Sequence, residues 1–182
     1  MDNVAYLRDI VRAFRNYKAL AEAALAQTPD AHLASAPDPN SNSIAVTVKH
    51  LAGNLRSRFR DFLTTDGEKP DRDRDGEFED RKDASRAEIL GWWEEGWSVA
   101  LGSITALTPP DVERTVHIRG EPFQVFEALN RSLTHTAYHV GQIVYLARHF
   151  AGPAWKSLSI PRGESAKFAA GAFKTQGLTP GR

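Results

Sequence analysis

The stretch that decides the fold, NRSLTHTAYHVGQIVYLARH, runs from Asn130 to His149. Apolar residues in and just before it recur at steps of three, four and seven, as on one face of a helix; they are Leu129, Leu133, Val140, Val144 and Ala147. No proline interrupts the chain from Gln124 to Gly152. The pattern therefore predicts a long amphipathic helix that packs one face against a core.

Two histidines, His135 and His139, stand four residues apart in this helix. Residues at i and i+4 lie on one helical face, and Gln142 falls beside them at the edge of the apolar arc. Two imidazoles on one rigid turn supply convergent lone pairs for a divalent metal; the alternative is hydrogen-bonded histidines at the edge of a core. A zinc peptidase is not expected, because Thr136 stands where its motif has a catalytic glutamate.

The composition describes a globular protein, with 41% apolar and 25% charged residues. Basic and acidic residues number 23 each, so no net charge favours nucleic acid or an anionic membrane. Cysteine is absent, which excludes disulfides, thiolate zinc ligands and a cysteine nucleophile. The first residues lack the apolar segment of a signal peptide, and no apolar run reaches about 18 residues. We therefore expect a cytoplasmic protein that binds neither membranes nor nucleic acid.

Three other amphipathic segments predict helices over residues 3–26, 43–65 and 84–107. The first two are joined by a proline-rich loop, where His32 is expected to be solvated, and the second and third by a charged stretch, residues 66–83, expected to be a solvated connector. Four such helices predict an all-α four-helix bundle, in which metal sites form between facing helices. We expect one domain over residues 1–182.

Two irregular segments flank the last helix. Residues 113–121 predict a short hairpin with a turn at Arg119-Gly120, on which His117 would be exposed. The tail, residues 151–182, is expected to be irregular, to lie over the bundle through Trp155 and Leu158, and to end in disordered residues.

The second helix offers a third histidine, which a metal site needs. His50 lies beside the apolar stripe in a row of polar or small residues; the others are Ser43, Thr47, Asn54 and Ser57. Alone it would be interpreted as a histidine at the core edge, but with His135 and His139 it completes a three-histidine set.

An acidic run in the connector and the tryptophans of the third helix have simpler interpretations. The run Asp71, Asp73, Asp75 and Gly76 matches the first half of an EF-hand loop, but Lys82 occupies the twelfth position, which needs a bidentate glutamate, so no calcium site is expected. The third helix carries three tryptophans, interpreted as core packing or as the wall of a ligand cleft; they are Trp92, Trp93 and Trp97.

These residues resemble the DinB-like superfamily of metal-binding four-helix proteins. The resemblance rests on His50 within TVKHLAGNL and on H-x-x-x-H followed by Gly141-Gln142-Ile143. It extends over nearly the whole chain, and the segments RSRFRDFLTTDGEKPDRDRDGEFEDR and WKSLSIPRGES resemble one bacterial branch. It implies a four-helix bundle, commonly a homodimer, with a divalent metal held by His50, His135 and His139. Some members are transferases or isomerases that use mycothiol, bacillithiol or glutathione, and others have no known activity.

The chemistry of such a site leaves two classes of function. Three neutral imidazoles and an open position would lower the pKa of a bound water or thiol, and the thiol must come from outside a chain without cysteine. The first class is a transferase that joins a small thiol to a small electrophilic substrate, using zinc or nickel, with iron and copper as further options. The second is a non-catalytic or vestigial metal-binding protein related to stress. Positive groups around the site favour the first class, and a sealed metal favours the second.

Three side chains near the histidines have open roles. Gln142 is expected either to orient a ligand or to make a hydrogen bond in helix packing. Tyr138 and Tyr145 flank the histidine face, where they would line the cleft or contact the other subunit of a dimer.

Overall fold

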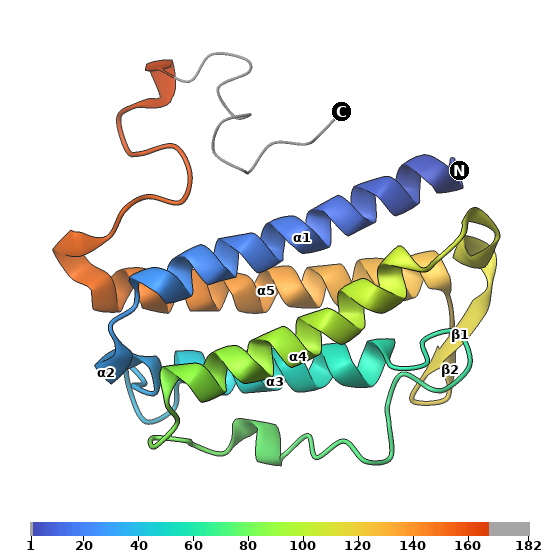
Figure 1. Cartoon of the computed structure of the whole chain (residues 1–182), viewed down its shortest axis with the longest axis horizontal. Coiled ribbons are helices and arrows are strands. Elements are labelled where there is room, and N and C mark those ends of the chain that lie inside the picture. Colours follow the sequence, from blue (N-terminus) through green and yellow to red (C-terminus); the bar gives the residue numbers. More distant parts are fainter. Residues whose placement is uncertain (1, 168–182) are drawn as a thin grey trace.

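The computed structural model describes residues 2–167, in which four long helices lie alongside one another (Figure 1). These helices are α1 (Asn3–Gln27), α3 (Ile44–Phe59), α4 (Arg86–Thr105) and α5 (Val125–Ala151). Shorter elements complete the described chain: α2 (Asp30–Leu33), strands β1 (Thr115–Ile118) and β2 (Glu121–Gln124), and the 3-10 helices η1 (Gly76–Phe78), η2 (Pro109–Glu113), η3 (Gly152–Ala154) and η4 (Ser165–Lys167). The expectation of a mostly helical protein is confirmed.

Three of the long helices, α1, α3 and α4, begin at side chains that satisfy their first backbone N–H groups. Asp2 accepts a hydrogen bond from the Ala5 amide, and Ser43 accepts one from the Val46 amide. At the start of α4, Ser85 and Glu88 form the reciprocal capping box that their spacing predicts. Local sequence therefore sets where these helices start.

The core forms where α3 packs against α4 and α5 while α1 packs against α5 and α4 (Figure 1). Phe14 on α1 makes edge-to-face contacts with Phe59 and Trp97, whose ring centroids lie 5.9 and 6.3 Å away. Trp93 and Trp97 are completely buried, so these two tryptophans are core residues. Trp92 is half-buried, and the Arg81 guanidinium lies over its ring.

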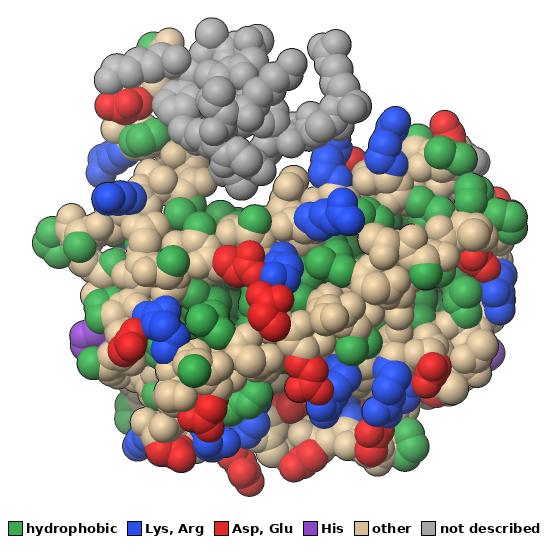
Figure 2. All heavy atoms as spheres, in the orientation of Figure 1, with side chains coloured by type: hydrophobic (Ala, Val, Ile, Leu, Met, Phe, Trp, Pro, Cys, Tyr) green, Lys and Arg blue, Asp and Glu red, His purple; other side chains and the backbone are tan. Residues whose placement is uncertain are grey.

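The outer face of α1 and α4 carries acidic and basic side chains next to one another (Figure 2). Lys18 on α1, for example, bridges Glu22 on its own helix and Glu94 on α4. None of the helices in the described part of the chain is long and apolar enough to span a membrane.

Two sequence-based expectations between α1 and the connector were wrong. The second helix ends at Phe59 rather than at residue 65, because Arg60 is extended and Asp61 has a positive φ of 51°. The loop between the first two long helices contains α2, and its His32 is partly buried rather than fully solvated: the His32 ring stacks on Phe150 with centroids 4.9 Å apart. Both differences come from turns and contacts that helical periodicity does not report.

The predicted hairpin is present as the antiparallel pair β1 and β2. Arg119 and Gly120 both have positive φ, as a two-residue turn of this kind requires. His117 is exposed as expected. The Asp66 carboxylate accepts hydrogen bonds from the Arg119 and Gly120 amides, at 2.9 and 2.8 Å, and so holds the turn against residues 66–83.

The described part of the tail, residues 152–167, is irregular apart from its two 3-10 turns. Trp155 and Leu158 are partly buried and pack against the core, as expected. The expectation of disorder at the end of the tail falls on residues 168–182, which lie outside the described residues.

The packing of α3 on α4 predicts that alanine substitution will have opposite effects on stability at two glycines of α4. A Cβ on Gly96 would lie 2.6 Å from the Ala52 Cα, so Gly96→Ala should lower the free energy of unfolding by about 1–3 kcal/mol. Gly102→Ala is the matched control: a Cβ there meets nothing, and the better helix propensity of alanine should raise stability by up to about 1 kcal/mol. Urea unfolding measures both, and equal effects would contradict the close approach at Gly96.

Candidate metal centre

Three histidines from two neighbouring helices come together inside the helical layer. His50 lies on α3, and His135 and His139 lie one turn apart on α5, which packs against α3. His50 and His139 are only 4% and 8% exposed, and His135 is half-buried. The structure therefore brings together the three residues that the sequence analysis selected.

The Nε2 atoms of the three rings face one another. His135 Nε2 lies 3.4 Å from His50 Nε2 and 3.2 Å from His139 Nε2. Nitrogen ligands at about 2.0–2.1 Å from a tetrahedral zinc ion are separated by about 3.3–3.4 Å, so these two separations are close to those of a zinc site. The ligand atoms of all three histidines lie within 4.8 Å of one another. In the part of the chain that the structure describes, this is the one group of histidines and carboxylates that could hold a metal ion.

The hydrogen bonds around the rings show that their Nε2 atoms present lone pairs. His50 Nδ1 lies 2.9 Å from a Glu77 carboxylate oxygen, and His139 Nδ1 lies 2.9 Å from the Gln142 amide oxygen. Because both oxygens accept, each Nδ1 carries the proton and each Nε2 is free to bind a metal. Gln142 thus orients His139, a role that differs from both of the expected ones.

Neither position of the His135 proton pairs all the ring nitrogens of the cluster. Its Nδ1 is buried without a hydrogen-bond partner among the described residues. A proton on Nε2 would satisfy one neighbouring lone pair and leave Nδ1 unpaired, whereas a proton on Nδ1 would leave three lone pairs facing one another. A cation between the rings would pair with all three Nε2 lone pairs, so the donor set fits a divalent metal.

The environment keeps the imidazoles of His135 and His139 in the neutral form that binds metal. Burial, followed by the neighbouring His139 and His50 and then by Arg58 and Arg72, lowers the pKa of His135 to about 3. Burial also lowers the pKa of His139. Both rings are therefore uncharged at pH 7.

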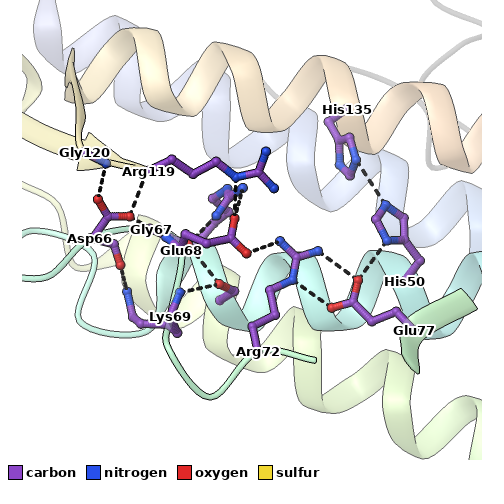
Figure 3. Close-up of polar contacts among 12 residues, drawn as sticks. His50, Asp66, Gly67, Glu68, Lys69, Arg72, Glu77, Arg119, Gly120 and His135 are labelled. Carbon is purple, nitrogen blue, oxygen red and sulfur yellow. Dashed lines mark hydrogen bonds and ion pairs between the residues drawn. The ribbon is translucent and has the colours of Figure 1, made fainter. Parts of the chain in front are cut away.

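The sequence analysis missed Glu77, because residues 66–83 were expected to be a solvated connector. In the structure Glu77 is buried, and both of its oxygens accept hydrogen bonds at 2.8 Å from Arg72 (Figure 3). Burial alone would raise the pKa of Glu77, but the hydrogen bonds from Arg72 and His50 outweigh it and the pKa is lowered. The carboxylate is therefore charged and fixes the orientation of His50.

Further ion pairs continue this network to the hairpin (Figure 3). Glu68 accepts hydrogen bonds from Arg72, from Arg58 on α3 and from Arg119 at the hairpin turn. Glu77 also packs against Gly53 on α3, where a Cβ would collide with the carboxylate. A glycine three residues after His50 was a sequence signal of this close approach, although it could not identify the partner.

A cavity of about 570 Å³ opens beside the histidines, and all three line it. The ring centroids of Phe78 and His50 lie 4.5 Å apart. The exposed Tyr138 ring makes a T-shaped contact with His139, with centroids 5.0 Å apart. Tyr138 therefore lines the cleft, one of its two expected roles. None of the tryptophans of α4 lines this cavity.

The acidic run in the connector has other partners. Asp71 pairs with Arg60, and an Asp73 oxygen accepts a hydrogen bond from the Gly76 amide at 2.9 Å. The absence of calcium binding by this segment stays a prediction.

The fold and the cluster define a mostly helical protein with three histidines placed to fit a metal ion. The family described as "Protein of unknown function (DUF1572)" matches residues 2–164, and the chain belongs to this family. No curated protein matches the chain.

The contact between Glu77 and His50 predicts that Glu77 strengthens metal binding. Glu77→Gln should weaken zinc affinity about 10- to 100-fold, because loss of such a carboxylate leaves the ligand ring poorly oriented and less basic. Competition with a chromophoric chelator measures the affinity. Glu79→Gln, an exposed residue two positions away, is the matched control and should change nothing. Equal affinities for the two variants would mean that Glu77 serves only Arg72.

Proposed function

We propose that the protein is a DinB-like four-helix bundle that uses a divalent metal to activate a low-molecular-weight thiol. The metal would be zinc or nickel, held by His50, His135 and His139, and the thiol would be transferred to a small electrophilic substrate. Four long helices that share a core, with imidazoles converging from two of them, support this assignment.

The observation that carries the proposal is that all three histidines line an open cavity, where a ligand can reach them. Its volume of about 570 Å³ is in the range of small-molecule sites, roughly 300–1,000 Å³. A site enclosed by side chains would instead favour the alternative, a non-catalytic metal-binding protein related to stress. Access for a ligand is a requirement of catalysis that a purely structural site does not have.

The roles of the residues follow from their contacts. A divalent ion supplies positive charge that lowers the pKa of a thiol reaching the site. The three neutral imidazoles leave that charge uncancelled, while Glu77 and Gln142 hold two of the rings in place. The thiol loses its proton to water, its sulfur forms a bond to the electrophilic carbon, and the leaving group departs with the electron pair of the bond that breaks. Without cysteine in the chain, this thiol is a cosubstrate.

Cobalt-substituted protein gives the direct test. Adding glutathione, bacillithiol or mycothiol should produce a thiolate-to-cobalt charge-transfer band, because a soft anion suits a site with three neutral ligands. His139→Ala should lose metal, band and transferase activity together while circular dichroism stays helical, since the core does not depend on the metal. His117→Ala, at an exposed histidine of the hairpin, should keep all of them. If none of the three thiols changes the spectrum, the non-catalytic alternative replaces the transferase.

We also propose a homodimer that contacts through α5. Tyr138 and Tyr145 are 64% and 72% exposed and lie seven residues apart, on one face of the helix. Light scattering should report about 40 kDa, twice the 20.1 kDa of the chain, and Tyr145→Arg should yield the monomer. A monomer for the wild-type protein at micromolar and higher concentration would contradict this proposal.

A further inference from the structure

The cavity beside the histidines has an unusually positive wall. Among the described residues, five arginines line it, whereas no aspartate or glutamate does; the arginines are Arg58, Arg72, Arg74, Arg119 and Arg131. They come from α3, the connector, the hairpin turn and α5, so four separate segments direct guanidinium groups to one space. Charge focused in a concave wall attracts ligands of the opposite sign.

Three of these arginines already have structural partners. Arg58 donates to the Gly67 carbonyl and to Glu68, and Arg72 donates to Glu77 and Glu68. Arg119 pairs with Glu68 as well, at 3.0 Å. These pairs build the wall, and Glu68 and Glu77 cancel part of its charge.

The other two guanidinium groups have donors to spare. Arg131 has no carboxylate partner among residues 2–167, and its guanidinium lies 6.0 Å from the centre of the Phe123 ring. Arg74 lies over the Phe78 ring and meets a carboxylate only at 3.9 Å, from the fully exposed Asp75. An exposed pair at this distance contributes little, so both arginines are available to a ligand.

Two buried polar side chains lie in the same wall. Asn54 and Ser132 are 8% and 7% exposed and line the cavity, and the Ser132 hydroxyl is buried without a hydrogen-bond partner among the described residues. Asn54 follows His50 by one turn of α3, and Ser132 precedes His135 by one turn of α5, so both lie next to the metal centre. Buried polar groups are normally hydrogen-bonded, so the unpaired Ser132 hydroxyl indicates that a polar ligand completes this part of the wall.

We propose that this cavity selects an anionic small molecule, with Arg74 and Arg131 binding its carboxylate or phosphate group. Asn54 and Ser132 bind its polar body, and its reactive end reaches the three histidines. The inference rests on the proposed function in one respect: it assigns the anionic group to the thiol or to the electrophile of that reaction. Guanidinium groups suit both carboxylate and phosphate because their paired donors match two oxygens.

Isothermal titration of the metal-loaded protein with succinate, inorganic phosphate and neutral succinamide tests the proposal. One of the two anions should bind, with affinity that falls as salt is added, and succinamide should not. The anion that binds more tightly identifies the group as carboxylate or phosphate. Arg74→Gln and Arg131→Gln should each weaken that binding about tenfold or more, the effect of losing a charge-assisted hydrogen bond.

Arg148→Gln is the matched control. Arg148 is exposed on the same helix as Arg131, about 25 Å along its axis, and does not line the cavity. The control should bind the anion as the wild-type protein does. Circular dichroism should show that all three variants are folded, since none of these three arginines makes a close ion pair with another described residue.

Two results would overturn the inference. In the first, neither anion binds better than succinamide. In the second, anion binding is unchanged in both cavity variants, which would mean that the metal alone holds the anion. Succinate and phosphate contain no thiol, so these results are separate from the cobalt test. Anion binding without a charge-transfer band would keep the anion site and remove the transferase. With both present, mercaptosuccinate should produce the band at lower concentration than 2-mercaptoethanol, and Arg131→Gln should reduce that preference.

Discussion

The buried ion pair between Arg72 and Glu77 is the interaction on which the histidine cluster depends. A buried carboxylate is costly unless it is paired and hydrogen-bonded, and Glu77 meets that condition through Arg72 and His50. The same pair holds the charged connector against α3, because Glu77 occupies the space left by Gly53. The orientation of His50 and the path of the connector are thus consequences of one contact.

The core and the site are built by different forces. Apolar burial among α1, α3, α4 and α5 places His50 opposite His135 and His139, while hydrogen bonds to Glu77 and Gln142 turn two of the rings. Because of this division, we expect the fold to tolerate changes at the three histidines. The arginines around the histidines have two roles. Some form ion pairs with Glu68 that build the cavity wall, and others are available to a ligand.

The sequence-based predictions succeeded where a property repeats along one element. Helical periodicity located the long helices, the Ser85 and Glu88 spacing located the start of α4, and alternation located the hairpin. They failed where a contact joins distant segments. The stacking of His32 on Phe150 and the end of α3 at Phe59 carry no periodic signal, and a dense run of charges looks solvated until its buried partner is known.

The sequence by itself determined that His135 and His139 share a face, because the helical repeat alone places residues four apart on one side. It also determined that any thiol must come from outside, because the chain has no cysteine. Only the tertiary structure decided that Glu77 orients His50, that Gln142 holds His139, and that five arginines surround one cavity. The physical reason is that these contacts join separate segments, and their geometry comes from how the helices pack and where the connector is anchored.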